Sequence, residues 1–196
     1  MNLKAIEKAM RKLKLPDEVL AQMNFDSMES AAILALLSKL PELLSEKQRY
    51  AIYDQLGCCK TGKYDAASKA FAKEHAGQPL TARITAMHHE GDAPYLNEDG
   101  TIGITVRCAV DELLGTFLSC HCIRRSHGKV FTQELVERGE MDFAAISQEY
   151  CGCCSGHWRH HLQRRLGVKL HLKKIGASLR TGDTVRMREF VYEIVE

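Results

Sequence analysis

The 196-residue sequence contains no apolar run that approaches the roughly 18 residues needed to cross a bilayer. Its first eight residues have helical spacing and lack the apolar core of a signal peptide. Positive and negative charges are nearly balanced, because the sequence has 27 Lys and Arg residues and 25 Asp and Glu residues, which gives a net charge of +2. This balance argues against a dedicated binder of nucleic acid. We expect a cytoplasmic protein without a membrane partner, and the oligomeric state stays open.

Disulfide bridges are also not expected, although the sequence contains eight cysteines. Eight cysteines would suit a framework of four disulfides in a secreted chain. The chain lacks a signal segment, and Cys58-Cys59 and Cys153-Cys154 are adjacent pairs. Neighbouring cysteines pair with each other only through a strained ring. We therefore expect reduced thiols that serve as metal ligands or as nucleophiles.

Helical periodicity dominates the first third of the chain. Ser45 and Gln48 form a capping-box pattern, and Gly57 is a suitable stop for the helix that they open. Pro41 is expected to end the preceding helix, because proline cannot donate a backbone hydrogen bond. A further helix is predicted over about 64–75.

Strand-like alternation appears after this helical part. Residues 82–87 and 102–108 each alternate between apolar and polar side chains, and we expect these two segments to pair as antiparallel strands. Alternation returns beyond residue 167 and again over 185–194. The last segment changes phase, which predicts a bulge near Arg188 or Glu189.

These patterns predict an α+β fold. A helical N-terminal third precedes an antiparallel sheet of about four strands with intervening helices. The helical region should cover residues 1–78, and the α+β region, which carries the Cys and His clusters, residues 79–196. At this length the two regions are expected to form one compact unit. The sequence contains no repeats of solenoid length and no low-complexity tract.

Chemistry-bearing residues are most concentrated at 151–161, which read Cys-Gly-Cys-Cys-Ser-Gly-His-Trp-Arg-His-His. If a helix begins near Ser155, helical phase turns the Trp158 stripe toward the core and aligns Cys154, His157 and His161 along one edge. Thiols near a helix N-terminus have a lowered pKa. We assign Cys154 as a candidate nucleophile, and His157 or His161 as its base. The alternative is a tight buried turn followed by surface histidines.

A metal site is the second interpretation of the same residues. Thiolate and imidazole ligands suit zinc or an iron–sulfur cluster. Neither the paired CxxC pattern nor a CxxC with HxxxH is present. Cys58 and Cys59 are further site candidates, in a loop that lacks the Ser or Thr that a phosphate loop needs after Lys63. The candidate ligands are Cys120, Cys122, Cys151, Cys153, Cys154 and His157.

The cysteine pattern resembles an uncharacterised family of bacterial domains with no assigned function. This resemblance covers most of the chain and is carried by the helical N-terminal region, the Gly-Cys-Cys loop, the Cys-x-Cys and the final Cys-x-Cys-Cys-x-Gly-His-Trp segment. More distantly, the part from Cys151 onward is similar to L-2-amino-thiazoline-4-carboxylate hydrolase-like proteins and to 4-vinyl-reductase-type ligand-binding domains. The shared elements are a cysteine-bearing helix, a Gly167-Val168 turn into a strand and a Gly182-Asp183 turn into the last strand.

That resemblance implies a small-molecule pocket, with hydrolytic chemistry as one use of it. The second group usually has Cys before Phe in the last strand, where this chain has Arg188-Glu189-Phe190, so a ligand site there does not transfer.

Three functions are consistent with these observations. The first is a Cys/His site that binds a metal or performs thiol chemistry on a small molecule, and the second is a non-catalytic sensor or ligand-binding module. The ligand could be an anion, because residues 157–174 carry six Lys or Arg residues and no acid. The third and weakest function is nucleic-acid binding by this basic segment, whose simplest role is a solvated face.

Overall fold

The computed structural model describes residues 3–26, 30–57, 60–89, 93–109, 139, 149, 152–176, 179–181 and 185–195. The architecture is α+β, with helices in the N-terminal part and an antiparallel sheet in the later part, as expected. The helices before the sheet are α1 (Leu3–Lys12), α2 (Asp17–Leu20), α3 (Ser30–Leu43), α4 (Glu46–Gln55), α5 (Lys63–Glu74) and α6 (Leu80–His89). None of the helices in these ranges, nor α9 below, is long and apolar enough to traverse a bilayer.

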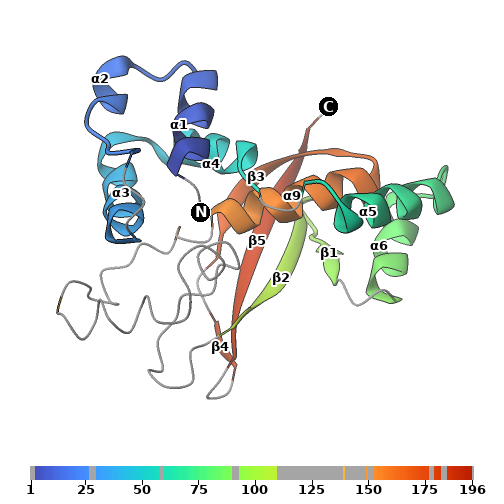
Figure 1. The fold of residues 1–196 in the computed structure, drawn as a ribbon. Coiled ribbons are helices and arrows are strands. Elements are labelled where there is room, and N and C mark those ends of the chain that lie inside the picture. Colours follow the sequence, from blue (N-terminus) through green and yellow to red (C-terminus); the bar gives the residue numbers. More distant parts are fainter. Residues whose placement is uncertain are drawn as a thin grey trace.

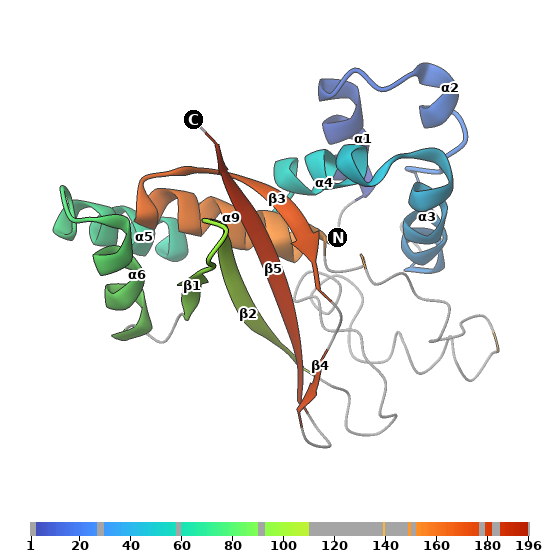
Figure 2. The same cartoon turned by 180° about the vertical axis from the view of Figure 1, so that it is seen from behind.

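The sheet has the strand order β1-β2-β5-β3, and β4 pairs with β5 beyond the end of β3 (Figures 1 and 2). All of these pairings are antiparallel. The strands are β1 (Pro94–Leu96), β2 (Ile102–Ala109), β3 (Lys169–Ile175), β4 (Leu179–Thr181) and β5 (Val185–Val195). Helix α9 (Gly152–Leu166) lies across one face of the sheet, with α1 to α4 toward one end of it and α5 and α6 toward the other (Figure 1).

The core fills the space between α9 and the sheet. Leu162 and Leu166 are buried on the sheet-facing side of α9, and Trp158 packs beside them. This arrangement confirms the core stripe that helical phase predicts. The strands contribute buried residues from alternate positions, namely Ile102, Ile104, Leu170, Leu172, Phe190 and Tyr192.

In the N-terminal part, the helix start predicted from a capping box is correct, whereas the helix end predicted from a proline is wrong. Ser45 and Gln48 form the predicted capping box at the start of α4. Pro41 was expected to end a helix, but it lies inside α3, which continues to Leu43. Pro41 is in the last turn of α3, so the hydrogen bond that it removes and the clash of its ring with the preceding turn disturb only the end of the helix. The predicted helix over about 64–75 is confirmed as α5.

The prediction of a strand at 82–87 is wrong, because this segment belongs to α6. The buried side chains are Ile84 and Met87, three residues apart, which is helical rather than strand spacing. The Arg83 amide donates to the Pro79 carbonyl at 3.1 Å, a helical hydrogen bond at the first turn. Alternating small residues such as alanine fit both periods, so the alternation alone did not discriminate between them.

The predicted strand at 102–108 is confirmed as β2, but its partners differ from those expected. Strand β1 lies between the two segments that were expected to pair, and it pairs with one edge of β2, while β5 pairs with the other. The expected bulge near Arg188 or Glu189 is also wrong. The β2–β5 register is continuous there, and the irregularity lies in β3, between Leu172 and Lys174.

Candidate functional site

Helix α9 begins at Gly152, three residues before the predicted start at Ser155. Its two glycines, Gly152 and Gly156, allow this first part of α9 to lie close to α4. A Cβ atom at Gly156 would lie 2.5 Å from the Leu56 carbonyl oxygen and closer still to that of Tyr53. A Cβ at Gly152 would meet the Tyr53 ring. The glycines therefore let α9 pack directly against the backbone at the end of α4, and Cys153 and Cys154 fall in the first turn of α9.

The cysteines and histidines of α9 lie on different sides of the helix. Cys153 is buried in the core, whereas Cys154 and His157 are half-buried. His161 is buried, and its ring centroid is 4.5 Å from that of His157. Both rings also stand edge-on to Tyr64, at 6.4 Å between centroids. Helical phase thus places Cys154, His157 and His161 along one edge, and the two imidazoles face α5.

The orientation of His161 follows from its hydrogen bond with Ser68. The Ser68 hydroxyl lies 3.0 Å from the Tyr64 carbonyl oxygen and 2.8 Å from Nδ1 of His161. This buried contact holds the His161 ring against α5, and which of the two groups donates depends on the imidazole tautomer.

His160 points to a separate ion-pair cluster centred on Asp65 of α5. Nε2 of His160 is 3.1 Å from the Asp65 carboxylate, and Arg164 and Lys69 lie 2.8 Å from it. The hydrogen bonds from Lys69 and His160, helped by the charge of Arg164, lower the pKa of Asp65 to about 2. This cluster joins α5 to α9.

This lowered pKa predicts acid sensitivity. The pKa of Asp65 is below its ordinary value of 3.8, so the stabilisation from its ion pairs is complete above that pH. It is lost as the pH falls toward 2, because the unfolded chain then carries the proton and Asp65 must release it to form its ion pairs in the folded state. We expect the free energy of unfolding to fall less steeply between pH 4 and pH 2 in Asp65→Asn than in the native chain, as measured by urea denaturation. Equal slopes would contradict this assignment.

Five of the predicted site residues, Cys58, Cys59, Cys120, Cys122 and Cys151, lie outside the described residues. The chain next to the first pair is described, and there Gly57 lies against the α9 backbone at Gly156 and His157. Within the described ranges, no group of three or more His, Cys, Asp or Glu side chains is arranged to hold a metal ion.

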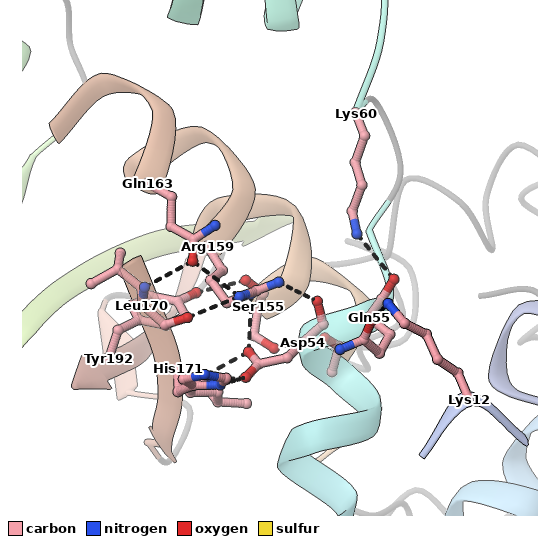
Figure 3. Close-up of polar contacts among 12 residues, drawn as sticks. Lys12, Asp54, Gln55, Lys60, Ser155, Arg159, Gln163, Leu170, His171 and Tyr192 are labelled. Atoms are coloured by element: carbon pink, nitrogen blue, oxygen red, sulfur yellow. Dashed lines mark hydrogen bonds and ion pairs between the residues drawn. The ribbon is translucent and has the colours of Figure 1, made fainter. Parts of the chain in front are cut away.

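A second polar cluster, on the side of α9 that faces α4 and β3, was missed from the sequence (Figure 3). Its centre is Asp54, whose side chain is 3% exposed. Nε of Arg159 lies 3.2 Å from one carboxylate oxygen, and Nδ1 of His171 lies 2.8 Å from the other. The Leu172 amide donates to the same carboxylate at 3.2 Å. Asp54 therefore joins α4, α9 and β3.

Several side chains around this cluster form hydrogen bonds with backbone groups on the outer edge of β3. Gln163 accepts a hydrogen bond from the Leu170 amide at 2.8 Å, and Arg159 donates to the Leu170 carbonyl at 2.9 Å. Tyr50 accepts one from the Ile175 amide at 3.4 Å. These groups lack a strand partner because β3 is the last strand of the order, so side chains from α4 and α9 replace the missing strand.

Burial governs the electrostatics of the cluster. It raises the pKa of Asp54 above its ordinary value, although Arg159 and the hydrogen bonds from His171 and Leu172 oppose that shift. Burial also lowers the pKa of Lys60, helped by the charge of Arg159. Lys60 donates to the Gln55 carbonyl at 3.0 Å, at the C-terminal end of α4 (Figure 3).

Comparisons with known proteins found no relative of this chain. No family model, no curated protein and no solved structure matches the chain.

Proposed function

We propose that the chain performs thiol chemistry on a small molecule at the edge of α9 formed by Cys154, His157 and His161. The observation that supports this proposal is the start of α9 at Gly152, which puts Cys154 in the first helical turn. Backbone N–H groups and the helix dipole favour a thiolate at that position. His157 follows at i+3 and His161 at i+7, so both imidazoles are on the same edge as the thiol.

The proposed roles follow from burial and hydrogen bonding. Cys154 is half-buried and packs against the edge of the core, whereas Cys153 is buried within the core. His157, also half-buried, would accept the thiol proton and return it to the leaving group. His161, held through Ser68, would position His157 across their 4.5 Å ring contact. Hydrolysis is one reaction of this kind.

Binding without turnover is the alternative function of the same edge. A sensor or ligand-binding module would use the half-buried side chains of α9 for recognition, and Cys154→Ser would leave its ligand affinity unchanged. The predicted metal, zinc or an iron–sulfur cluster, would need Cys120, Cys122 and Cys151 in addition to Cys153, Cys154 and His157. Metal analysis of anaerobically purified protein tests the prediction of a bound zinc or iron–sulfur cluster directly.

The test of thiol chemistry is the alkylation rate of each cysteine by iodoacetamide between pH 5 and pH 9, followed by peptide mass mapping. We expect Cys154 to react about tenfold faster at pH 7 than Cys153, because the former is the more accessible and the more readily ionised. His157→Gln should slow the reaction of Cys154 and shift its pH dependence upward.

The matched control is His160→Gln, which removes an imidazole of the same helix that faces Asp65 instead. It should leave the alkylation of Cys154 unchanged. If Cys154 alkylates no faster than an unfolded peptide thiol, or if the two histidine variants behave alike, thiol catalysis at this edge is wrong.

A further inference from the structure

The pair formed by Asp54 and His171 has the geometry of an oriented base. The carboxylate is almost fully buried, whereas the His171 side chain is 44% exposed. Their contact of 2.8 Å joins Oδ2 to Nδ1, and a carboxylate can only accept, so Nδ1 carries the proton. The other ring nitrogen, Nε2, makes no hydrogen bond to a described residue and carries the lone pair in the neutral ring.

Arg159 shares the Asp54 carboxylate with His171. Its guanidinium lies 3.2 Å from the other carboxylate oxygen and balances the buried negative charge. A neutral imidazole can act as a base, and the imidazolium that forms after proton uptake is stabilised by the same carboxylate. The third charged neighbour is Glu193 of β5, which is directly opposite His171 in the sheet register.

The edge of β3 does not need this imidazole. The backbone groups of Leu170, Leu172 and Ile175 are hydrogen-bonded by Gln163, Arg159, Asp54 and Tyr50, and His171 takes part in none of these bonds. The network thus holds the strand and the carboxylate in place, while the histidine is an additional group at its exposed end. The same pairing of a buried orienting carboxylate with a histidine base is found in catalytic triads.

We propose that His171 is a general base, oriented by Asp54, that activates water for attack on a small acyl ester. Nε2 takes a proton from water as the water oxygen bonds to the acyl carbon. The carbon–oxygen bond to the leaving group then breaks, and the imidazolium returns the proton to the departing oxygen. No oxidant, metal or further nucleophile enters this balance. The site is built around Asp54 from α4, α9 and β3, and it does not depend on thiol chemistry at the Cys154 edge.

The test uses the full chain and p-nitrophenyl acetate, with nitrophenolate release followed between pH 5 and pH 9. We expect His171→Gln to lower the steady rate about a hundredfold or more, which is the lower end of the usual contribution of a general base. The matched control is His75→Gln. His75 is also partly exposed, but its Nδ1 faces the Gln78 amide oxygen at 3.1 Å instead of a carboxylate.

Two readouts separate catalysis from a structural role. Urea denaturation should show that both glutamine variants are folded, and ¹⁵N chemical shifts should show the Nδ1–H tautomer for neutral His171. Cys154→Ser should leave the His171-dependent rate unchanged, so failure here is distinct from failure of the thiol proposal. Equal rates in the two histidine variants, the opposite tautomer, or a burst that leaves an acetyl group on His171 would each overturn the proposal.

Discussion

Gly156→Ala should cost this protein about 3 kcal/mol of unfolding free energy, or prevent folding altogether. In most helices the same change is stabilising, because alanine has the higher helix propensity. Here the added Cβ would overlap two backbone carbonyl oxygens, those of Tyr53 and Leu56. Backbone cannot rotate away as a side chain can, so α9 would have to move off α4, and overpacking of this kind is destabilising. Urea denaturation followed by circular dichroism measures the effect.

The control is Gly152→Ala on the same helix. Its Cβ would meet the ring of Tyr53 at 2.5 Å, and this clash is with one side chain instead of with two backbone carbonyls. We therefore expect a smaller loss than at Gly156. If the two alanine variants are equally stable, or if either exceeds the native chain, direct packing of α9 on α4 is incorrect.

Asp54→Ala should lower the free energy of unfolding by about 3–5 kcal/mol, the usual cost of removing one partner from a buried ion pair. This loss is not a measure of strong attraction between Asp54 and its partners. The cost of burying the carboxylate outweighs that attraction, because the pKa of Asp54 is raised above its ordinary value. The loss arises because Arg159 and the Leu172 amide would be left without their acceptor. Equilibrium denaturation in urea at pH 7 measures it.

Two variants sharpen this result. Asp17→Ala removes a carboxylate that is 94% exposed and 3.9 Å from Arg11, and should change stability by less than about 1 kcal/mol. Asp54→Ala combined with Arg159→Met should recover part of the loss, because the orphaned charge is removed as well. A single Asp54→Ala variant as stable as Asp17→Ala would show that the cluster does not join α4, α9 and β3.

The features predicted correctly from the sequence are those set by local chemistry. The capping box at Ser45 depends on residues three positions apart, and the inward stripe of α9 depends on helical phase alone. The strand predicted at 82–87 failed for the complementary reason. Its alternation is consistent with either period, and packing of Ile84 and Met87 in the folded chain decides for a helix.

The candidate site divides in the same way. Cys154, His157 and His161 are neighbours on one helix, so their shared edge could be predicted from sequence spacing. Asp54, Arg159 and His171 come from three different elements. More than 100 residues separate Asp54 from Arg159 in the sequence. A weak signal existed, because Asp54 follows Tyr50 by one helical turn and both are buried on α4. Nothing in the sequence indicated that β3 would be the strand beside them.

The side-chain bonds along β3 also bear on how copies of this chain behave toward each other. An exposed edge strand offers its free amide and carbonyl groups to any other strand, which is a common route to sheet extension and aggregation. Here a second strand would first have to displace the guanidinium of Arg159, the amide of Gln163 and the carboxylate of Asp54. The same contacts that fasten β3 to the helices thus prevent the sheet from growing across that edge.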